Sequence, residues 1–140
     1  GLLASQRLAV LATQGQGQPY GSLVSFASTP DGRQILFATS RSTRKYENLK
    51  ADPRVALVID NRSNRESDFQ EAVAVTATGR AEEVADAERA SLLELYLEKH
   101  PYLADFVTAP ACTLLRVRVE TYYLVSRFQQ VEELSVDRWA

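Results

Sequence analysis

An unbroken run of six hydroxyl and cationic side chains stands in the first half of the chain: Ser40, Arg41, Ser42, Thr43, Arg44 and Lys45. The run lies where a helix is expected to begin, and the first turn of a helix leaves backbone N–H groups without partners. Those N–H groups, the hydroxyls and the planar guanidinium of arginine all suit a phosphate. A simpler reading assigns one hydroxyl to capping the helix and the cations to a solvated face. The residue types alone leave both readings open.

The positive charge of this segment is local. Between Thr39 and Lys50, four cations stand against a single acid, Glu47, for a net charge of +3. The whole chain carries a formal charge of −2, and the stretch from Glu82 to Asp105 holds seven acids against two cations. A general binder of nucleic acid or of anionic membranes would show a broad basic excess. We therefore expect neither nucleic acid nor a membrane as a partner.

Length and cysteine content fit a small cytoplasmic domain. The 140 residues are enough for one buried core, and we expect residues 1–140 to form a single domain. Cys112 is the only cysteine, so no intramolecular disulfide forms, which favours a reducing compartment. The longest apolar runs, "LAVLA" and "VALVI", are too short to span a bilayer, and no secretion signal opens the chain.

Apolar alternation and turn residues predict a chain made mostly of short strands. Strands are expected over residues 8–13, 20–28, 34–39, 55–59, 72–84 and 114–128. In the last of these, residues 115, 117 and 119 are apolar and face one way, and the charged residues between them face the other.

Two helices are predicted between the strands. The first runs from Thr43 to Ala51 and must stop near Asp52, because Pro53 disfavours helical geometry in the residue before it. The second starts at an Asp86 cap and ends around His100. Many antiparallel strands and few short helices predict a mainly β (α+β) fold, a barrel of six to seven antiparallel strands with short helices outside it.

The remaining reactive residue types give weaker signals. His100 is expected to be a structural cation, stabilised by the dipole at the helix end. Cys112 stands in an apolar context and is expected to be a buried, inert thiol. The pairs Glu82–Glu83 and Glu132–Glu133 are expected to be solvated, and no set of ligands has the spacing of a metal site.

The segment "ATSRSTRKYENLKADPRVALVID", followed by "GRAEEV", resembles the FMN-binding split-barrel family related to pyridoxamine 5'-phosphate oxidase, and the likeness extends from "RLAVLAT" to "YYLVSRF". The resemblance implies a split barrel with FMN as cofactor. It matches Thr39, Thr43, Arg44 and Lys45 to the residues that hold the FMN phosphate, with Ser40, Arg41 and Asn48 as their neighbours. It also matches the strand that contains Ser22, Val24 and Ser25 to the strand whose edge runs beside the isoalloxazine ring.

The implied function is that of a flavin-dependent oxidoreductase whose substrate is not specified. Ala38 stands where the oxidases carry Tyr, and a small residue near Ala74 stands where they carry Gln, which argues against pyridoxine chemistry. The alternative is a module without turnover that holds a flavin, a deazaflavin or haem. Haem is not expected as the native ligand, because haem-degrading relatives carry His near the position of Lys45.

A homodimer with flavin at the subunit interface is also expected. Tyr122, Leu124, Phe128 and the apolar face of residues 114–119 supply more apolar surface than one small core is expected to use. The resemblance implies that the second subunit walls part of the flavin ring. The candidates for this wall are residues 126–128 and the loop from Asn61 to Asp68.

Overall fold

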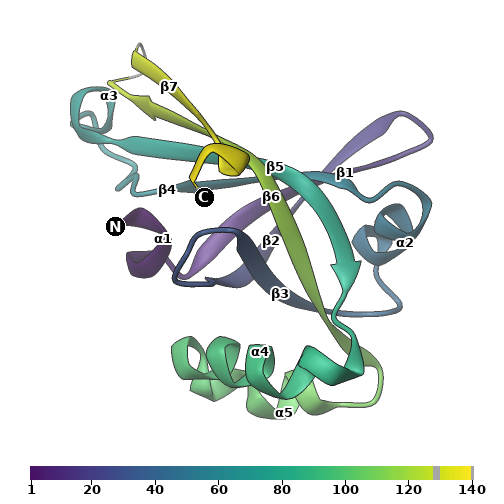
Figure 1. Cartoon of the computed structure of the whole chain (residues 1–140). Coiled ribbons are helices and arrows are strands. Elements are labelled where there is room, and N and C mark those ends of the chain that lie inside the picture. The colour runs from purple at the N-terminus through teal and green to yellow at the C-terminus, as the bar shows by residue number, and fades with distance from the viewer. Residues whose placement is uncertain (128–129, 140) are drawn as a thin grey trace.

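Seven antiparallel strands form most of the protein (Figure 1). The computed structural model describes residues 1–127 and 130–139, and the side chains of residues 138 and 139 are outside that description. The strands are β1 (Leu8–Gly15), β2 (Gln18–Ser28), β3 (Gln34–Ser40), β4 (Arg54–Asp60), β5 (Val73–Glu83), β6 (Cys112–Ser126) and β7 (Gln130–Ser135).

Six of these strands close into a barrel. They are hydrogen-bonded in the order β3-β2-β1-β4-β5-β6, and β3 also pairs with β6, from Gln34 opposite Arg118 to Ser40 opposite Cys112. The 15-residue β6 is long enough to close the barrel with its first half and to pair with β7 through its second half. The predicted mainly β fold, a split antiparallel barrel of six to seven strands with short helices, is therefore confirmed.

Alternation along the strands fills the barrel with apolar side chains. Leu11, Leu57, Ala77 and Val117 come from four different strands and are fully buried. The inward face predicted for residues 115, 117 and 119 is confirmed, since all three belong to this core. Gly79 stands at an irregularity between β5 and β6, where a Cβ atom would collide with the carbonyl oxygen of Arg118.

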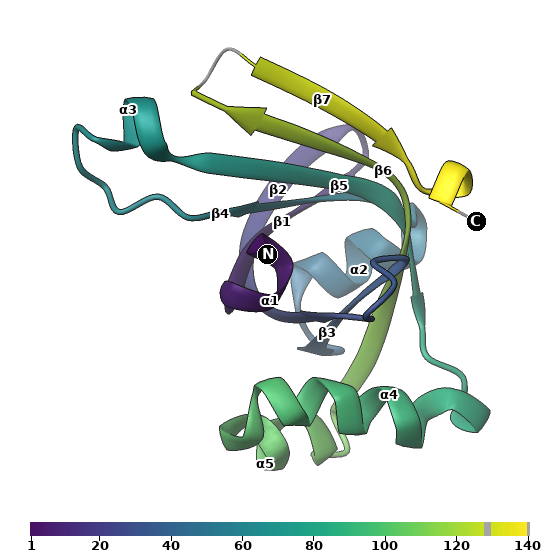
Figure 2. The same ribbon diagram turned by 60° about the vertical axis from the view of Figure 1, so that its left-hand side comes forward.

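The helices lie outside the barrel. They are α1 (Leu2–Ser5), α2 (Arg44–Ala51), α3 (Asp68–Glu71), α4 (Asp86–Lys99) and α5 (Ala104–Thr108), with short 3₁₀ turns η1 (Pro101–Leu103) and η2 (Val136–Trp139). α4 and α5 lie together below the barrel in both ribbon views, away from α2 (Figures 1 and 2). A second apolar cluster, which includes Leu36, Tyr96, Val107 and Leu114, joins α4 and α5 to the outer face of the sheet. In the described part of the chain, no helix combines the length and the apolar character needed to cross a membrane.

Two predictions about α4 were wrong in detail. Ala85, not Asp86, is the N-cap, and Asp86 lies in the first turn, where its charge still suits the helix dipole. His100 does follow the helix, but its ring is buried rather than solvated, and burial lowers its pKa. The neutral ring lies with Nε2 2.7 Å from the carbonyl oxygen of Phe26 and Nδ1 3.3 Å from the Tyr102 hydroxyl. His100 is thus a structural hydrogen-bonding residue, not a structural cation.

The prediction that Glu82 and Glu83 are only solvated was also wrong. Glu82 stands opposite Arg116 in the β5–β6 register, and its carboxylate accepts hydrogen bonds from the Nε groups of Arg116 (2.8 Å) and Arg118 (2.6 Å). Arg116 also lies 2.7 Å from the carboxylate of Glu88 on α4. This network holds α4 against the barrel. Glu132 and Glu133 are exposed on β7, and Cys112 is a buried thiol whose pKa is raised by burial, both as predicted.

Candidate functional site

The polar run leaves β3 and enters α2 through a tight turn. Thr43 is the N-cap of α2, and its hydroxyl oxygen accepts a hydrogen bond from the N–H of Tyr46 at 3.3 Å. The same oxygen lies 3.0 Å from the hydroxyl of Thr39, which is itself buried at the end of β3. The capping interpretation is therefore correct for one hydroxyl. This cap leaves other N–H donors of the first turn without an acceptor, because no hydrogen bond among the described residues starts from the N–H of Arg44 or of Lys45.

A cavity of about 360 Å³ opens beside this helix end. We call it the α2 cavity; it is lined by Leu23, Val24, Ser25, Ala38, Thr39, Ser40, Thr43, Lys45, Tyr96, Leu103 and Phe106. One part of this lining carries hydroxyls and an ammonium group, and the other part is apolar or aromatic. The α2 cavity therefore offers a polar end and an apolar end within one small space.

The apolar end lies where the barrel is split. β2 pairs with β1 from Gln18 to Ser25, but its pairing with β3 covers only Phe26 to Ser28. The β3-facing edge of β2 before Phe26 therefore carries backbone groups that β3 does not use. One of them is held by α4, since the Tyr96 hydroxyl donates to the carbonyl oxygen of Ser25 at 3.2 Å.

The structure brings six of the ten predicted site residues to the α2 cavity: Val24, Ser25, Thr39, Ser40, Thr43 and Lys45. Residues 39–45 come together because they are consecutive and turn around the start of α2, and residues 24 and 25 reach the same place from the neighbouring strand. The other four, Ser22, Arg41, Arg44 and Asn48, lie elsewhere.

Arg41 and Arg44 both point away from the cavity lining. The guanidinium of Arg41 donates to the carbonyl oxygen of Pro110 at 3.1 Å and lies 3.5 Å from the carboxylate of Glu83. Arg44 is exposed, with its guanidinium 5.9 Å from the centre of the Tyr20 ring in the β1–β2 hairpin. Each arginine thus has a partner that the sequence did not indicate.

The side chains of Asn48 and Ser22 lie against the barrel and not in the α2 cavity. The side-chain amide of Asn48 is buried against β1, where it donates to the hydroxyl of Thr13 at 3.0 Å. Ser22 stands opposite the fully buried Leu11, so it faces the barrel interior, and its hydroxyl has no partner among the described residues. Their predicted contact with a cofactor stays a prediction that the geometry does not favour.

Sequence reasoning missed the helical wall and one acid. Tyr96, Leu103 and Phe106 come from α4, η1 and α5, some 50 residues or more beyond the motif, and apolar spacing on a helix shows only that one face is buried. Glu83 accepts a hydrogen bond from the Tyr46 hydroxyl at 3.1 Å. Desolvation raises the pKa of Glu83, but hydrogen bonds from Thr113 and Tyr46 and the nearby cations together lower it by more. The net shift is downward, so the group is an anion beside α2.

A protein-family model described as pyridoxamine 5'-phosphate oxidase matches residues 1–126. The chain belongs to the pyridoxamine 5'-phosphate oxidase family. This confirms the resemblance found in the residues of β3, α2 and β4.

Similar proteins include both haem and flavin proteins. The chain is 31% identical over 101 residues to "Non-canonical heme oxygenase HOZ, chloroplastic" of Arabidopsis thaliana, which covers 71% of this chain and 30% of that protein. A heme binding protein from Mycobacterium smegmatis has the same fold with a TM-score of 0.87, at 21% identity over 99% of this chain and 56% of its own. A FAD-binding protein from Mesorhizobium loti matches with a TM-score of 0.70, at 22% identity over 88% of this chain and 86% of its own.

The two structural likenesses fall below 25% identity and show the fold alone. The chain also spans less than a third of the Arabidopsis protein and just over half of the mycobacterial one. Proteins described as haem-binding and as FAD-binding therefore share the fold of this chain.

Proposed function

We propose that the protein binds FMN in the α2 cavity, with the phosphate at the start of α2 and the ring against the edge of β2. The observation that carries this proposal is the two-ended lining. Thr39, Ser40 and Thr43 supply hydroxyls and Lys45 supplies an ammonium group, at a helix end with unused N–H donors. The opposite wall offers Tyr96 and Phe106 for a flat, largely apolar ring.

The charge distribution favours a phosphate over a neutral ligand. Among the described residues that line the α2 cavity, Lys45 is the one that carries a charge, and no carboxylate belongs to the lining. Glu83 lies near the helix, but it is engaged by Arg41 and Tyr46. An ammonium group and several hydroxyls around one point, without a matching acid, are the donor set that a phosphate monoester requires.

We further propose that the bound flavin works in an oxidoreductase. FMN would supply hydride transfer, and the protein would bind it, orient it and keep water from its apolar end. The lining contains no His, Cys or carboxylate among the described residues, so the side chains of this subunit provide orientation rather than a strong acid or base. Tyr96 is held in place by Ser25, and burial raises its pKa, so its hydroxyl stays protonated near neutral pH. The single free thiol, Cys112, suits a reducing compartment, and we place this activity in the cytoplasm.

The second candidate function is haem binding without flavin chemistry. It is favoured by the similarity to the Arabidopsis heme oxygenase and the mycobacterial heme binding protein. In this chain the one histidine is not available as an iron ligand, because His100 is buried and its ring nitrogens face Phe26 and Tyr102 at hydrogen-bond distance.

One set of spectra separates these candidates. The absorption spectrum of the purified protein is measured first, followed by titrations with FMN, FAD, riboflavin and haem. We expect FMN to bind roughly tenfold or more tightly than riboflavin, because riboflavin lacks the phosphate that Lys45 would hold. Equal affinity for FMN and riboflavin would contradict the phosphate site. A Soret band in protein from haem-replete cells, with no response to FMN, would favour the second candidate.

We also propose a homodimer in which the partner subunit completes the flavin site. The reason given by the sequence needs correction, because Tyr122 and residues 114–117 are buried within the chain. The exposed apolar side chains include Leu8 and Leu23 on the outer face of β1 and β2, and Phe69 on α3. Leu23 also lines the α2 cavity, so a subunit placed on this face would reach the flavin.

Two segments were predicted to provide the partner's wall. In the loop from Asn61 to Asp68, the carboxylate of Asp68 accepts hydrogen bonds from the N–H groups of Ser63 (2.9 Å) and Asn64 (2.7 Å), which gives the loop a defined shape. The second segment, residues 126–128, ends at Phe128, which lies outside the described residues. Sedimentation across a dilution series tests the shared site, since a ligand that binds only the dimer shifts dissociation to lower protein concentration. A monomer that still binds FMN tightly would refute it.

A further inference from the structure

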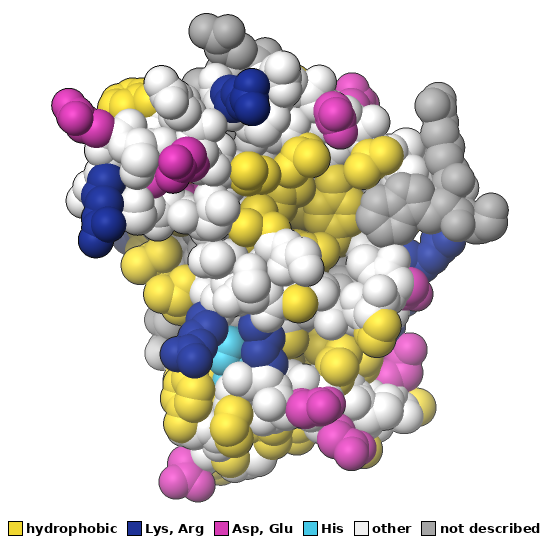
Figure 3. Space-filling model, turned by 90° about the vertical axis from the view of Figure 1, so that its left-hand side faces the viewer, with side chains coloured by type: hydrophobic (Ala, Val, Ile, Leu, Met, Phe, Trp, Pro, Cys, Tyr) yellow, Lys and Arg dark blue, Asp and Glu magenta, His cyan; other side chains and the backbone are white. Residues whose placement is uncertain are grey.

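A second, larger cavity opens on the face that carries the N-terminus, where hydrophobic side chains form a patch (Figure 3). Its volume is about 710 Å³, within the range of small-molecule sites. We call it the α1 cavity; its apolar walls come from Leu2 and Leu3 on α1, Val75 on β5, Leu95 on α4, Leu124 on β6 and Leu134 on β7. None of the residues that line it belongs to the lining of the α2 cavity.

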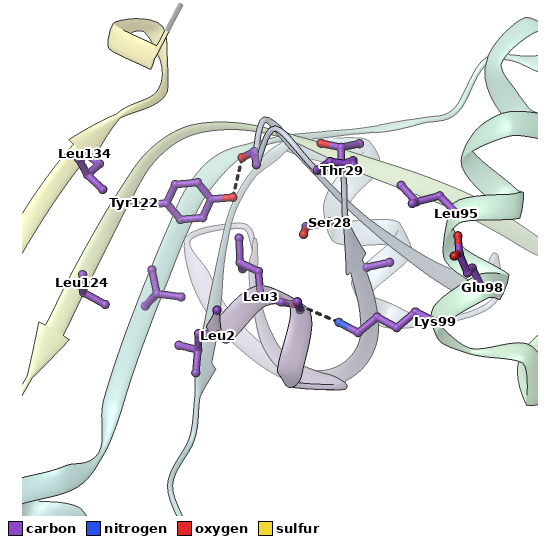
Figure 4. Close-up of a pocket in the computed structure, with 16 residues that line it drawn as sticks. Leu2, Leu3, Ser28, Thr29, Leu95, Glu98, Lys99, Tyr122, Leu124 and Leu134 are labelled. Atoms are coloured by element: carbon purple, nitrogen blue, oxygen red, sulfur yellow. Dashed lines mark hydrogen bonds between the residues drawn. The ribbon is translucent and has the colours of Figure 1, made fainter.

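One cationic side chain, Lys99, reaches into this apolar space from the last turn of α4 (Figure 4). Its Nζ donates to the carbonyl oxygen of Leu3 at 3.0 Å and lies 3.9 Å from the centre of the Phe26 ring. None of the ion pairs among the described residues includes Lys99. An ammonium group has three donors; Leu3 accepts from one and the Phe26 ring faces the group closely, so donor capacity for a ligand remains.

The surroundings of Lys99 favour an anion. Burial lowers the pKa of Lys99 to about 8, because the apolar walls disfavour its charge. A carboxylate close to Nζ would remove this penalty and gain a charge-assisted hydrogen bond. The nearest acid on the same helix, Glu98, also lines the cavity but is exposed, so solvent and salt screen its charge. Tyr122 directs its hydroxyl to the carbonyl oxygen of Gly32 at 2.7 Å.

We propose that the α1 cavity binds a monocarboxylate with an unbranched aliphatic tail, with the carboxylate at Lys99 and the tail against the leucines of α1, β6 and β7. A single ammonium group beside Glu98 suits one negative charge better than a phosphate dianion. Among the described residues of the lining, the large apolar side chains are mostly aliphatic and Tyr122 is the one aromatic ring, so a flexible alkyl chain fits better than a flat ring. This site shares no lining residue with the proposed flavin site, so the two proposals can be tested independently.

Calorimetric titration of the full chain with octanoate, decanoate and dodecanoate, below their micelle concentrations, tests the tail. We expect saturable binding of one molecule per chain, with an affinity that rises about fourfold per added methylene until the tail fills the cavity. Decylamine has the same tail with the opposite charge and is expected to bind much more weakly than decanoate. Equal binding of decanoate and decylamine, or no saturation with any of the acids, would overturn the proposal.

A matched pair of variants tests the head group. Lys99→Met keeps the apolar stem and removes the charge, so decanoate affinity should fall by about tenfold or more while decanol affinity stays the same. Glu98→Gln changes the neighbouring residue of the same cavity and should not weaken decanoate. Decanoate binding to Lys99→Met at wild-type strength would contradict the assigned head group.

A measurement on the unmodified protein makes the test independent of whether the variants fold. In backbone NMR spectra, decanoate should shift the amide signals of Leu3, Lys99 and Leu124, which line the α1 cavity. Shifts confined to residues 39–45 would instead place decanoate in the α2 cavity and refute the proposal.

Discussion

The two cavities both border on α4 and each contains one lysine, but the chain builds them in different ways. The polar side of the α2 cavity comes from residues 39–45, a single turn between a strand and a helix. The α1 cavity draws its walls from both ends of the chain and from α4, with Lys99 as its one cation among the described residues. The first is a cluster of donors at a helix end, and the second is a half-buried ammonium group in a largely apolar wall.

This difference predicts different ligands. Several hydroxyls, free N–H groups and Lys45 share the charge of a small polyanion without burying any of it alone. Lys99 has one protein acceptor, the carbonyl oxygen of Leu3, and an apolar environment that lowers its pKa. One cavity therefore suits the phosphate of a cofactor, and the other suits a single carboxylate on an apolar tail.

The largest expected effect is the difference in FMN affinity between variants of the two lysines, Lys45 and Lys99. Lys45→Ala should weaken FMN binding roughly ten- to a hundredfold, because a hydrogen bond to a charged group is lost. Arg44→Ala should also weaken it, but by less, since Arg44 lies over Tyr20 outside the cavity lining. Lys99→Met should leave FMN binding unchanged. Flavin fluorescence titrations at low salt measure all three.

Two results would remove the contrast between the lysines. A loss of FMN affinity in Lys99→Met as large as in Lys45→Ala would show that the two cavities are not independent. If Lys45→Ala binds FMN with wild-type affinity and has an unchanged circular dichroism spectrum, Lys45 does not contact the phosphate and is only a solvated cation.

The next effect concerns the helix that the two cavities share. His100→Leu removes the donor to the carbonyl oxygen of Phe26 and leaves that buried group unpaired, so the free energy of unfolding should fall by about 1–3 kcal/mol. His100→Gln can still donate there and should lose less. Urea denaturation of both variants gives the comparison. Equal losses would mean that the ring's packing on Tyr96, with centroids 5.1 Å apart, matters more than the hydrogen bond.

The same contrast explains what the sequence could predict. Hydroxyls and cations in one run at a predicted helix start reveal the α2 cavity, because neighbours in sequence are there neighbours in space. The barrel was also readable, since strict alternation in β6 fixes which face is buried. The hydrogen bonds of Arg41 to Pro110 and of Asn48 to Thr13 could not be predicted, because these partners lie on distant segments.

The α1 cavity could not be predicted either, because its residues come from segments that lie far apart in the sequence. Its walls are single apolar residues on α1, β5, β6, β7 and α4, and each of them alone looks like an ordinary core position. In the sequence, Lys99 stood out only as one of two cations in the acidic stretch from Glu82 to Asp105, and His100 was predicted to be a structural cation. Burial decided both outcomes, and burial depends on tertiary packing that one sequence does not display.

A smaller effect is expected at the boundary of the α2 cavity. Tyr96→Phe keeps the ring and removes the hydrogen bond to the carbonyl oxygen of Ser25, so the free energy of unfolding should fall by about 0.5–1.5 kcal/mol. Tyr102→Phe, which loses only a 3.3 Å contact between an exposed side chain and His100, is the matched control and should change less. Thermal unfolding of both variants provides the measurement, and a larger loss in Tyr102→Phe would contradict the role given to Tyr96.

The smallest effect is the pH dependence that His100 adds to stability. Burial lowers its pKa below the ordinary value of 6.5, the hydrogen bond to Phe26 partly opposes this, and the charges of Lys99 and Arg7 lower it further. The unfolded chain therefore binds the proton more readily than the folded chain does. The free energy of unfolding should rise with pH up to about 6.5, and this contribution should be lost as pH falls from there through the folded pKa. His100→Gln has no such proton, whereas carboxylates with lowered pKa values, such as those of Asp52 and Glu82, affect both proteins alike. Urea midpoints measured from pH 7.5 down to pH 5 should thus fall more steeply for the wild type than for His100→Gln, and parallel curves would show that the ring is not held neutral between α4 and β2.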